Sequence, residues 1–260
     1  MPDSPRWRRG VASAVLVLLG LGASAQGCGG SPAPVTLTVL AASSLTEAMG
    51  ELGAAYGRSH PRVRVRAEFG GSQEMADRLA DRQRADVLVT ADDAAMDKAA
   101  DYLTGRRRVV AHNSLTIAVQ PGNPQRIRGL ASLARPGLRI AVGAAAVPVG
   151  RYTRQVFAKA GLGVHWSSEE ISARAVLDRV RAGEADAGLV YITDLRSAGA
   201  AAASVAIPAE QNVTATYPAS VVKDTAHEDE AKAFVAWLAS PEAARLFNRC
   251  GFATPVAPQR

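Results

Sequence analysis

Short apolar runs rich in β-branched residues alternate with alanine-rich amphipathic segments along most of this sequence. Such runs predict buried strands, here at residues 35–42 (VTLTVLAA), 85–91 (ADVLVTA), 115–119 (LTIAV), 138–142 (LRIAV) and 187–192 (AGLVYI). Residues 63–69 (VRVRAEF) alternate between apolar and polar, which is typical of a half-buried strand.

Apolar residues recur at helical spacing in the segments between these strands. Helices are expected at residues 45–56, 72–82, 150–160 and 173–182, with a last helical stretch at 230–247. This alternation of strands and helices predicts an α/β fold whose parallel sheets carry helices on both faces. No period of about twenty to fifty residues recurs, which excludes a solenoid.

Two segments have the pattern of junctions between lobes. Residues 112–124 (HNSLTIAVQPGNP) begin a strand and leave it through a Pro/Gly turn, and residues 212–224 (NVTATYPASVVKD) cross the chain late. The sequence therefore predicts one lobe formed by residues 35–115 and 217–260, and a second formed by residues 116–216. Two α/β lobes joined by paired crossings make a hinged cleft, and ligands bind such sheets at the carboxyl ends of strands.

The N-terminus has the pattern of an export signal. Basic residues precede an apolar stretch at 11–25 that is too short to span a membrane comfortably, so residues 1–27 are predicted to be a signal peptide. Gly27 directly precedes Cys28, and a Gly/Ser/Pro tether follows at 28–34, which is typical of bacterial lipoproteins. Cys28 is therefore predicted to carry a lipid that anchors a periplasmic or extracytoplasmic protein to the membrane; ordinary cleavage after Ala25 is the alternative.

Charge and cysteine content narrow the possible partners. The chain has 260 residues and a formal net charge of +6, which falls to about +4 when three Arg and one Asp leave with residues 1–27. Its basic residues are scattered or stand in short runs such as 105–110 (GRRRVV) without interleaved aromatic residues, so no nucleic-acid partner is expected. Cys250 is the one other cysteine; it is expected to be a small buried apolar residue, since lipidation of Cys28 leaves it unpaired.

The segment AASSLTEAM (residues 41–49) places hydroxyls where a strand gives way to a helix. Ser44 and Glu47 have the spacing of a capping box, and a helix N-terminus with a hydroxyl is also an anion site. A nucleophilic serine is the enzymatic alternative, but GGSQE (70–74) lacks the closing glycine of G-x-S-x-G. The four histidines stand in apparent loop or cap positions, and H-E-x-x-H is absent. We therefore expect no catalytic residues.

Several segments together resemble a known family. AASSLTEAM, FGGSQEMADRL, ADVLVTADDAAMDKA, NSLTIAV, LRIAVGAAAVPVGRYTRQVF, GEADAGLVYITD and SPEAARLFNRCGF stand in the order found in periplasmic molybdate-binding proteins of ABC importers. The resemblance covers residues 35–252. It implies a two-lobed periplasmic-binding-protein fold of type II, with molybdate or tungstate held in the cleft between the lobes. It further implies a monomer that needs no cofactor and delivers its ligand to an ABC permease.

The resemblance also implies which residues of the first lobe contact the ligand. The serine of the family's AASL motif corresponds to Ser44 rather than Ser43, which is left with a structural role. The second serine follows a phenylalanine and two small residues, and so corresponds to Ser72 in FGGS. Capping of a helix is the structural alternative for Ser72.

In the second lobe the family uses two backbone amides and a tyrosine. The amide before the glycine of the family's VPAG motif corresponds to Val149 in VPVG, and the amide that starts the helix before AVL corresponds to Ala173. The tyrosine that ends a strand corresponds to Tyr191 in GLVY. An ordinary loop into a helix at Val149 and a half-buried strand aromatic at Tyr191 are the structural alternatives.

This set has a common chemistry, because hydroxyls and backbone amides all donate hydrogen bonds. A fully deprotonated tetrahedral oxyanion offers only acceptors, so molybdenum is expected to be bound as the oxyanion and not as a ligated metal ion. A protonated phosphate would need a carboxylate, and Glu74 and Asp92 lie near enough in sequence to leave that possibility open. Sulfate has the same charge and shape as molybdate and remains the alternative ligand. Ferric iron is less favoured, since no two tyrosines are adjacent.

Overall fold

The structure, a computed structural model, describes residues 33–255. Its first element is the strand β1 (Val35–Ala42). The predicted signal peptide, the predicted lipidation site Cys28 and the predicted tether as far as Pro32 lie outside this range. In a first group of strands, β1 pairs in parallel with β2 (Val63–Gly70) and β3 (Val87–Val89). β9 (Thr214–Val222) continues this group antiparallel to β3, and β4 (Leu103–Val119) pairs antiparallel to β9.

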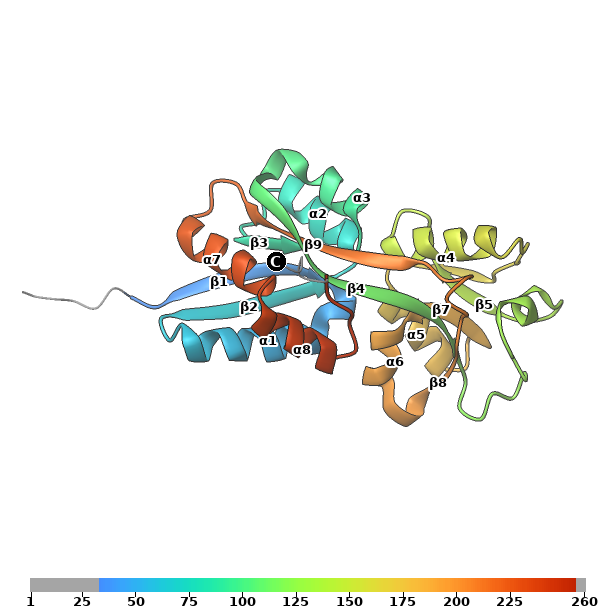
Figure 1. Cartoon of the computed structure of the whole chain (residues 1–260). Helices are drawn as coiled ribbons and strands as arrows, with labels where there is room; N and C mark the ends of the chain where they lie inside the picture. The colour runs from blue at the N-terminus through green and yellow to red at the C-terminus, as the bar shows by residue number, and fades with distance from the viewer. Residues whose placement is uncertain (1–32, 256–260) are drawn as a thin grey trace, which may run out of the picture. The chain divides into compact units, whose positions relative to one another are not determined.

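Helices cover both faces of this first group (Figure 1). One face carries α1 (Thr46–Ser59), α7 (Glu228–Leu238) and α8 (Pro241–Arg249), and the other carries α2 (Ser72–Ala80) and α3 (Asp93–Lys98). The alternation of side chains along β1 explains the two layers. Leu37 and Val39 pack in one core cluster with Phe234 of α7, whereas Leu40 packs in another with Met75 of α2.

A second group of strands forms around the C-terminal part of β4. β4 pairs antiparallel with β7 (Ala187–Tyr191) and β8 (Ala203–Val205), and β5 (Ile140–Gly143) pairs in parallel with β7 and β6 (Ser168–Glu170). Its helices are α4 (Pro148–Lys159), α5 (Ala173–Arg181) and α6 (Ile192–Ala198). Short 3-10 turns stand at Ser43–Leu45, Ala100–Tyr102, Leu130–Ala134 and Gly199–Ala201.

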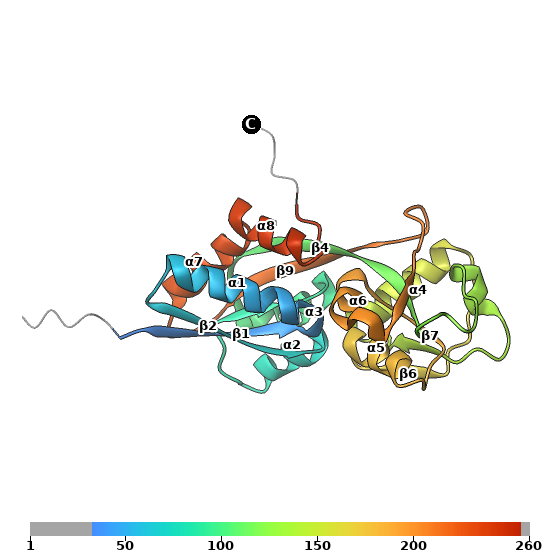
Figure 2. The ribbon, with the colours of Figure 1, turned by 90° about the horizontal axis from the view of Figure 1, so that it is seen from below.

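The strands β4 and β9 pass from one group to the other (Figure 2). β4 pairs with β9 as far as Ser114 and with β7 from Leu115 onward, so a single strand belongs to both groups. The core is also continuous, because Leu37 and Ile117 belong to the same cluster of buried residues. The lobe boundaries predicted after residues 115 and 216 stay a prediction, since the shared strands leave no break in the chain there.

The strands predicted from the sequence form, and each group contains parallel pairs as predicted, but β4, β8 and β9 pair antiparallel with their neighbours. The predicted strand at 115–119 is the end of β4, which is 17 residues long, and β9 was predicted only as a crossing. Arg106 and Arg108 lie inside β4 and are exposed, and its pairing with β9 shifts register between Thr104 and Arg108. Local pattern missed this part of β4 because its strand conformation depends on pairing with a distant segment.

Close packing at the start of α4 requires a glycine. A Cβ built on Gly150 would lie 1.9 Å from the carbonyl oxygen of Ala144 and 2.3 Å from that of Gly143. No side chain of a neighbour can move aside to relieve this contact, because both atoms belong to the backbone. The glycine therefore allows β5 to turn tightly into α4.

Gly150→Ala is expected to lower the free energy of unfolding by about 1–3 kcal/mol, because the added methyl group overpacks the turn. Gly50→Ala is the matched control: Gly50 lies in α1, and a Cβ there has nothing within 4 Å. Alanine in a helix interior stabilises by about 0.5–1 kcal/mol relative to glycine, so the control is expected to gain stability. Denaturant unfolding measures both variants, and equal midpoints would contradict the packing argument.

Candidate ligand-binding site

The ends of three strands and the starts of three helices meet at one small cavity of about 20 Å³. A volume of about 10–15 Å³ on this measure holds one water molecule, so the cavity suits a ligand of few atoms. All five residues predicted to contact the ligand line it. Its lining is Ala42, Ser43, Ser44, Gly70, Gly71, Ser72, Ala91, Val147, Pro148, Val149, Ile171, Ser172, Ala173 and Tyr191.

A larger cavity, of about 830 Å³, lies elsewhere, beside the N-terminal part of β1 and the end of β9. None of the five predicted residues lines it. Its wall mixes basic residues such as Arg84 and Lys223 with acidic residues such as Asp101 and Asp224, so it presents no single charge to a ligand. The small cavity is therefore the candidate site.

Ser44 reaches the cavity from the 3-10 turn that follows β1. Its side chain is buried, and its Oγ lies 2.9 Å from the hydroxyl oxygen of Tyr217 on β9. The predicted capping box with Glu47 does not form: α1 begins at Thr46, with Leu45 at the N-cap and no side-chain cap. Glu47 instead pairs with Arg174 at 3.0 Å. Ser44 thus lines the cavity and its hydroxyl contacts Tyr217, but it does not cap α1.

Ser72 is the first residue of α2 and follows two glycines. It does not cap its own helix, because Gly71 occupies the N-cap. Its buried Oγ accepts the backbone N–H of Ala91 at 2.9 Å, which ties the start of α2 to the end of β3. The structural alternative of a simple cap is therefore not what the side chain does.

Val149 and Ala173 bring helix N-termini to the cavity. Val149 follows Pro148 in the first turn of α4, and Ala173 is the first residue of α5, after the capping residue Ser172. Backbone amides in the first turn of a helix have no acceptor within the helix, and the macrodipole places partial positive charge there. Side chains are not needed for these contacts. Both positions can therefore donate to an anion, whichever residue stands there.

Tyr191 ends β7 and is buried, with 2% of its surface exposed. Its hydroxyl oxygen has no hydrogen-bond partner among residues 33–255, although Tyr191 lines the cavity together with Ser44 and Ser72. Burial raises the pKa of Tyr191 well above its usual value, with the nearby Tyr217 adding to the effect. The hydroxyl therefore stays protonated and has a hydrogen to donate.

No residue that lines the cavity within the described range is charged. Of the two carboxylates left open by the sequence, Glu74 pairs with Arg78 at 2.8 Å. Asp92 caps α3 by accepting the N–H of Ala95, and its other oxygen accepts from Arg151 at 2.6 Å. Neither carboxylate lines the cavity, so neither is placed to accept a proton from a ligand.

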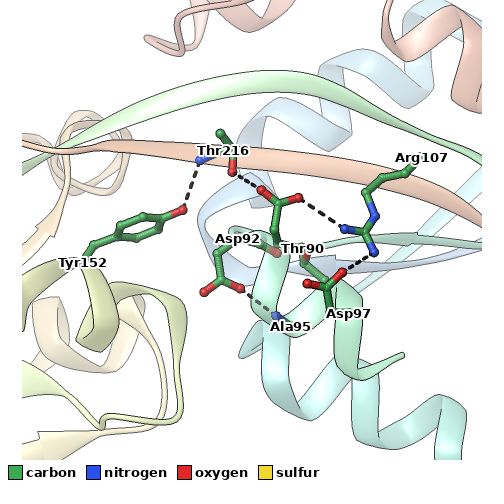
Figure 3. A network of polar contacts seen from close by, with 8 residues as sticks. Thr90, Asp92, Ala95, Asp97, Arg107, Tyr152 and Thr216 are labelled. Carbon is green, nitrogen blue, oxygen red and sulfur yellow. Dashed lines mark hydrogen bonds and ion pairs between the residues drawn. The ribbon is translucent and has the colours of Figure 1, made fainter. Parts of the chain in front are cut away.

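Several contacts near the cavity join the two groups of strands. Besides Asp92–Arg151 and Glu47–Arg174, a Cβ on Gly71 would lie 2.6 Å from the carbonyl oxygen of Ile171. Figure 3 shows how Tyr152 accepts the backbone N–H of Thr216 beside the start of α3. The cavity thus has walls from both groups, held together by ion pairs and close backbone contact.

The site contains no arrangement for catalysis or for a metal ion. No histidine lines the cavity, and the Oγ atoms of Ser44 and Ser72 contact Tyr217 and Ala91, so neither serine has a general base. Among residues 33–255, no group of three or more His, Cys, Asp or Glu is placed to hold a metal ion. An uncharged cavity of hydrogen-bond donors between two α/β lobes is typical of a solute-binding protein.

Comparison with known proteins gives the family. A model of bacterial extracellular solute-binding proteins matches residues 37–253, and the chain belongs to this family. Membership confirms the prediction that the chain is a binding protein and not an enzyme. It also confirms that the protein acts outside the cytoplasm, in agreement with the predicted export. Within residues 33–255, no helix is long and apolar enough to cross a membrane.

Individual relatives agree with the family. The molybdate-binding protein ModA of Mycobacterium tuberculosis is 36% identical over 253 residues, 95% of this chain and 97% of its own. This confirms the resemblance found in the sequence. Among solved structures, the Azotobacter vinelandii periplasmic molybdate-binding protein has a TM-score of 0.71 at 21% identity, covering 84% of this chain and 99% of its own. The sulfate-binding protein SubI of M. tuberculosis has a TM-score of 0.77 at 20% identity, covering 86% and 88%. Both structures support the two-lobed fold.

Some residues around the cavity were not among those predicted from the sequence. Tyr217 contacts Ser44 from a position 173 residues later in the chain, and no local pattern signals such a contact. Ser172 lines the cavity and caps α5, and a serine just before an apolar helical run could have been found from the capping rule. Ser43 also lines the cavity, although it was assigned a purely structural role.

The buried carboxyl group of Asp194 accepts a hydrogen bond from the backbone N–H of Tyr191. Burial raises its pKa to about 7, against the opposing effects of the Tyr191 amide, which it accepts, and of Arg174. The folded chain therefore holds a proton that the unfolded chain, with a pKa of 3.8, has already lost. Between pH 3.8 and about pH 7, the contribution of Asp194 to the free energy of unfolding therefore decreases as the pH rises.

Asp194→Asn is expected to remove this part of the pH dependence, so that its melting temperature falls less than that of the wild type between about pH 4 and pH 7. Thermal unfolding of both proteins over this range is the measurement. Asp81→Asn, which changes an exposed carboxylate at the C-terminal end of α2, is the matched control and is expected to keep the wild-type slope. Parallel profiles for wild type and Asp194→Asn would show that Asp194 is ionised in the folded state.

Proposed function

We propose that this protein captures molybdate or tungstate outside the cytoplasm and delivers it to the permease of an ABC transporter. The observation that carries the proposal is the buried hydroxyl of Tyr191, which has no partner among residues 33–255 and lies in a cavity of donors without a charged side chain. Buried polar groups are nearly always hydrogen-bonded, so the missing partner is expected to be the ligand.

A fully deprotonated tetrahedral dianion fits this donor set. It has only acceptor oxygens, and the cavity supplies the hydroxyls of Ser44, Ser72 and Tyr191 together with amides at the starts of α4 and α5. Helix N-termini stabilise negative charge without a counter-ion. The anion itself is the ligand, so no cofactor is expected to be needed. The resemblance to molybdate-binding proteins favours a monomer.

The relatives support the same ligand. The M. tuberculosis relative at 36% identity is named for molybdate, and tungstate has the same shape and charge. Sulfate is the competing candidate, since the same donors suit it and one structural neighbour is named for it. Isothermal titration of the mature protein against molybdate, tungstate, sulfate and phosphate tests the proposal. Tight binding of sulfate with no binding of molybdate would overturn it.

Removal of single donors tests how affinity is distributed. A hydrogen bond to a charged group contributes about 1.5–3 kcal/mol, so Ser44→Ala, Ser72→Ala and Tyr191→Phe are each expected to weaken molybdate binding about ten- to a hundredfold. Isothermal titration measures the dissociation constants. Ser43→Ala is expected to weaken binding much less. A greater loss of affinity from Ser43→Ala than from Ser44→Ala would show that Ser43, and not Ser44, contacts the ligand.

Exposed arginines provide the matched control for this series. Arg106 and Arg108 are exposed on β4 and do not line the cavity, so Arg106→Gln and Arg108→Gln are expected to leave affinity almost unchanged. A large loss from these variants, with the donor variants unaffected, would show that surface charge and not the donor cavity binds the anion.

A lipid on Cys28 is the proposed membrane anchor, supported by Gly27 before it and the sequence rich in Gly, Ser and Pro after it. Cys28→Ser is expected to move the protein from the membrane fraction to the soluble fraction when cells are fractionated. Cys250→Ser is the control and is expected to stay with the membrane, because Cys250 lies next to α8 in the folded part of the chain. A Cys28→Ser protein that remains in the membrane fraction would exclude the lipid anchor.

A further inference from the structure

Hydrogen bonds connect Asn113 on β4 to Tyr217, and Tyr217 to Ser44. The donor of each bond can be assigned, starting from Asn113. The Oδ1 atom of Asn113 accepts the backbone N–H of Ser114 at 2.9 Å, which fixes the orientation of the side-chain amide. Its Nδ2 atom therefore faces the hydroxyl of Thr193 at 2.8 Å and the hydroxyl of Tyr217 at 3.4 Å. An amide nitrogen can only donate, so both hydroxyl oxygens act as acceptors in these contacts.

The hydroxyl of Tyr217 connects Asn113 to Ser44. Its oxygen accepts from Asn113, and among the contacts of residues 33–255 the Oγ of Ser44, 2.9 Å away, is the acceptor within reach of its hydrogen. Asn113 and Tyr217 are buried and line neither of the two cavities described above, so water offers the Tyr217 hydroxyl no alternative partner there. Ser44 thus accepts from Tyr217, and its own hydrogen remains available to the cavity that it lines.

Ser72 has the same arrangement with a different donor. Its Oγ accepts the backbone N–H of Ala91 at 2.9 Å, and its hydrogen is likewise left for the cavity. A backbone amide cannot reverse its role, so Ser72 is fixed as a donor by the main chain. Ser44 depends instead on side chains, because its direction is set by Asn113 and Tyr217.

We infer that Asn113 and Tyr217 are positioning residues that hold Ser44 as a hydrogen-bond donor to the ligand, and so favour oxyanions that carry no proton. The inference rests on the proposed function and assigns a role to two residues that do not line the cavity. A protonated oxyanion must place its O–H against an acceptor. The hydrogens of Ser44, Ser72 and Tyr191 are all directed at the ligand in this arrangement. An O–H group of the ligand would therefore face hydrogen-bond donors and find no acceptor among these three side chains.

A double-mutant cycle tests whether Tyr217 acts through Ser44. Loss of one neutral hydrogen bond corresponds to about a three- to tenfold change, so Tyr217→Phe is expected to weaken molybdate binding by that factor. In the Ser44→Ala background the same substitution is expected to change the affinity by less than about twofold, because the hydroxyl that it positions is absent. Isothermal titration of the four proteins gives the coupling. Equal losses in both backgrounds would overturn the inference.

Tyr152→Phe is the matched control for a buried tyrosine hydroxyl. Tyr152 accepts the backbone N–H of Thr216, next to Tyr217 in sequence, but has no contact with Ser44 among those described. Its effect on affinity is expected to be small and the same in both backgrounds. Asn113→Ala is the second variant should Tyr217→Phe fail to fold. It keeps both hydroxyls but removes the donor that directs them, and it is expected to weaken binding only when Ser44 is present.

Selectivity gives a readout that a purely structural role would not change. Sulfate carries no proton at neutral pH, whereas inorganic phosphate carries at least one. In Tyr217→Phe the Oγ of Ser44 is released to accept, so the ratio of sulfate affinity to phosphate affinity is expected to fall at least about threefold. An unchanged ratio would overturn the selection of unprotonated anions. Failure of the wild type to bind any tetrahedral oxyanion would overturn the proposed function as well, whereas additive losses in a binding-competent wild type overturn this inference alone.

Discussion

The antiparallel pairing of β4 with β9 is the constraint on which the rest of the structure depends. Its register places Ala111 opposite Tyr217, and the continuation of β4 places Leu115 opposite Tyr191. Because side chains alternate along a strand, a slip of one residue would turn these side chains to the other face of the sheet. The same ladder therefore joins the two lobes and sets the positions of the groups behind and within the cavity.

Electrostatics in the cavity depend on dipoles and not on opposite charges. No charged residue lines it within the described range, and nearby carboxylates are occupied by Arg78 and Arg151. A buried lysine or arginine would bind many anions, since a point charge places weak demands on geometry. Fixed hydroxyls and helix N-termini are directional instead, so an anion is favoured only when its oxygens lie where the donors point.

Local pattern was enough to predict the buried strands, most of the helices and the class of fold. It did not predict the long form of β4, where Arg106 and Arg108 stand in a strand only because β9 pairs with that segment. The five candidate contacts came from resemblance, and two of them are backbone amides that no side-chain chemistry could reveal. Tyr217 could not be predicted, because its partner Ser44 is 173 residues away and the contact exists only in the folded chain.

The close approach of Gly71 to the carbonyl oxygen of Ile171 has a consequence for kinetics. Both residues form the wall of the cavity, one from each group of strands, so release of an enclosed ligand is expected to require the two groups to move apart. The residence time then includes the rate at which contacts such as Glu47–Arg174 break, and not only the strength of the donors. Because this ion pair is partly exposed, salt is expected to shorten the residence time without altering any atom that touches the ligand.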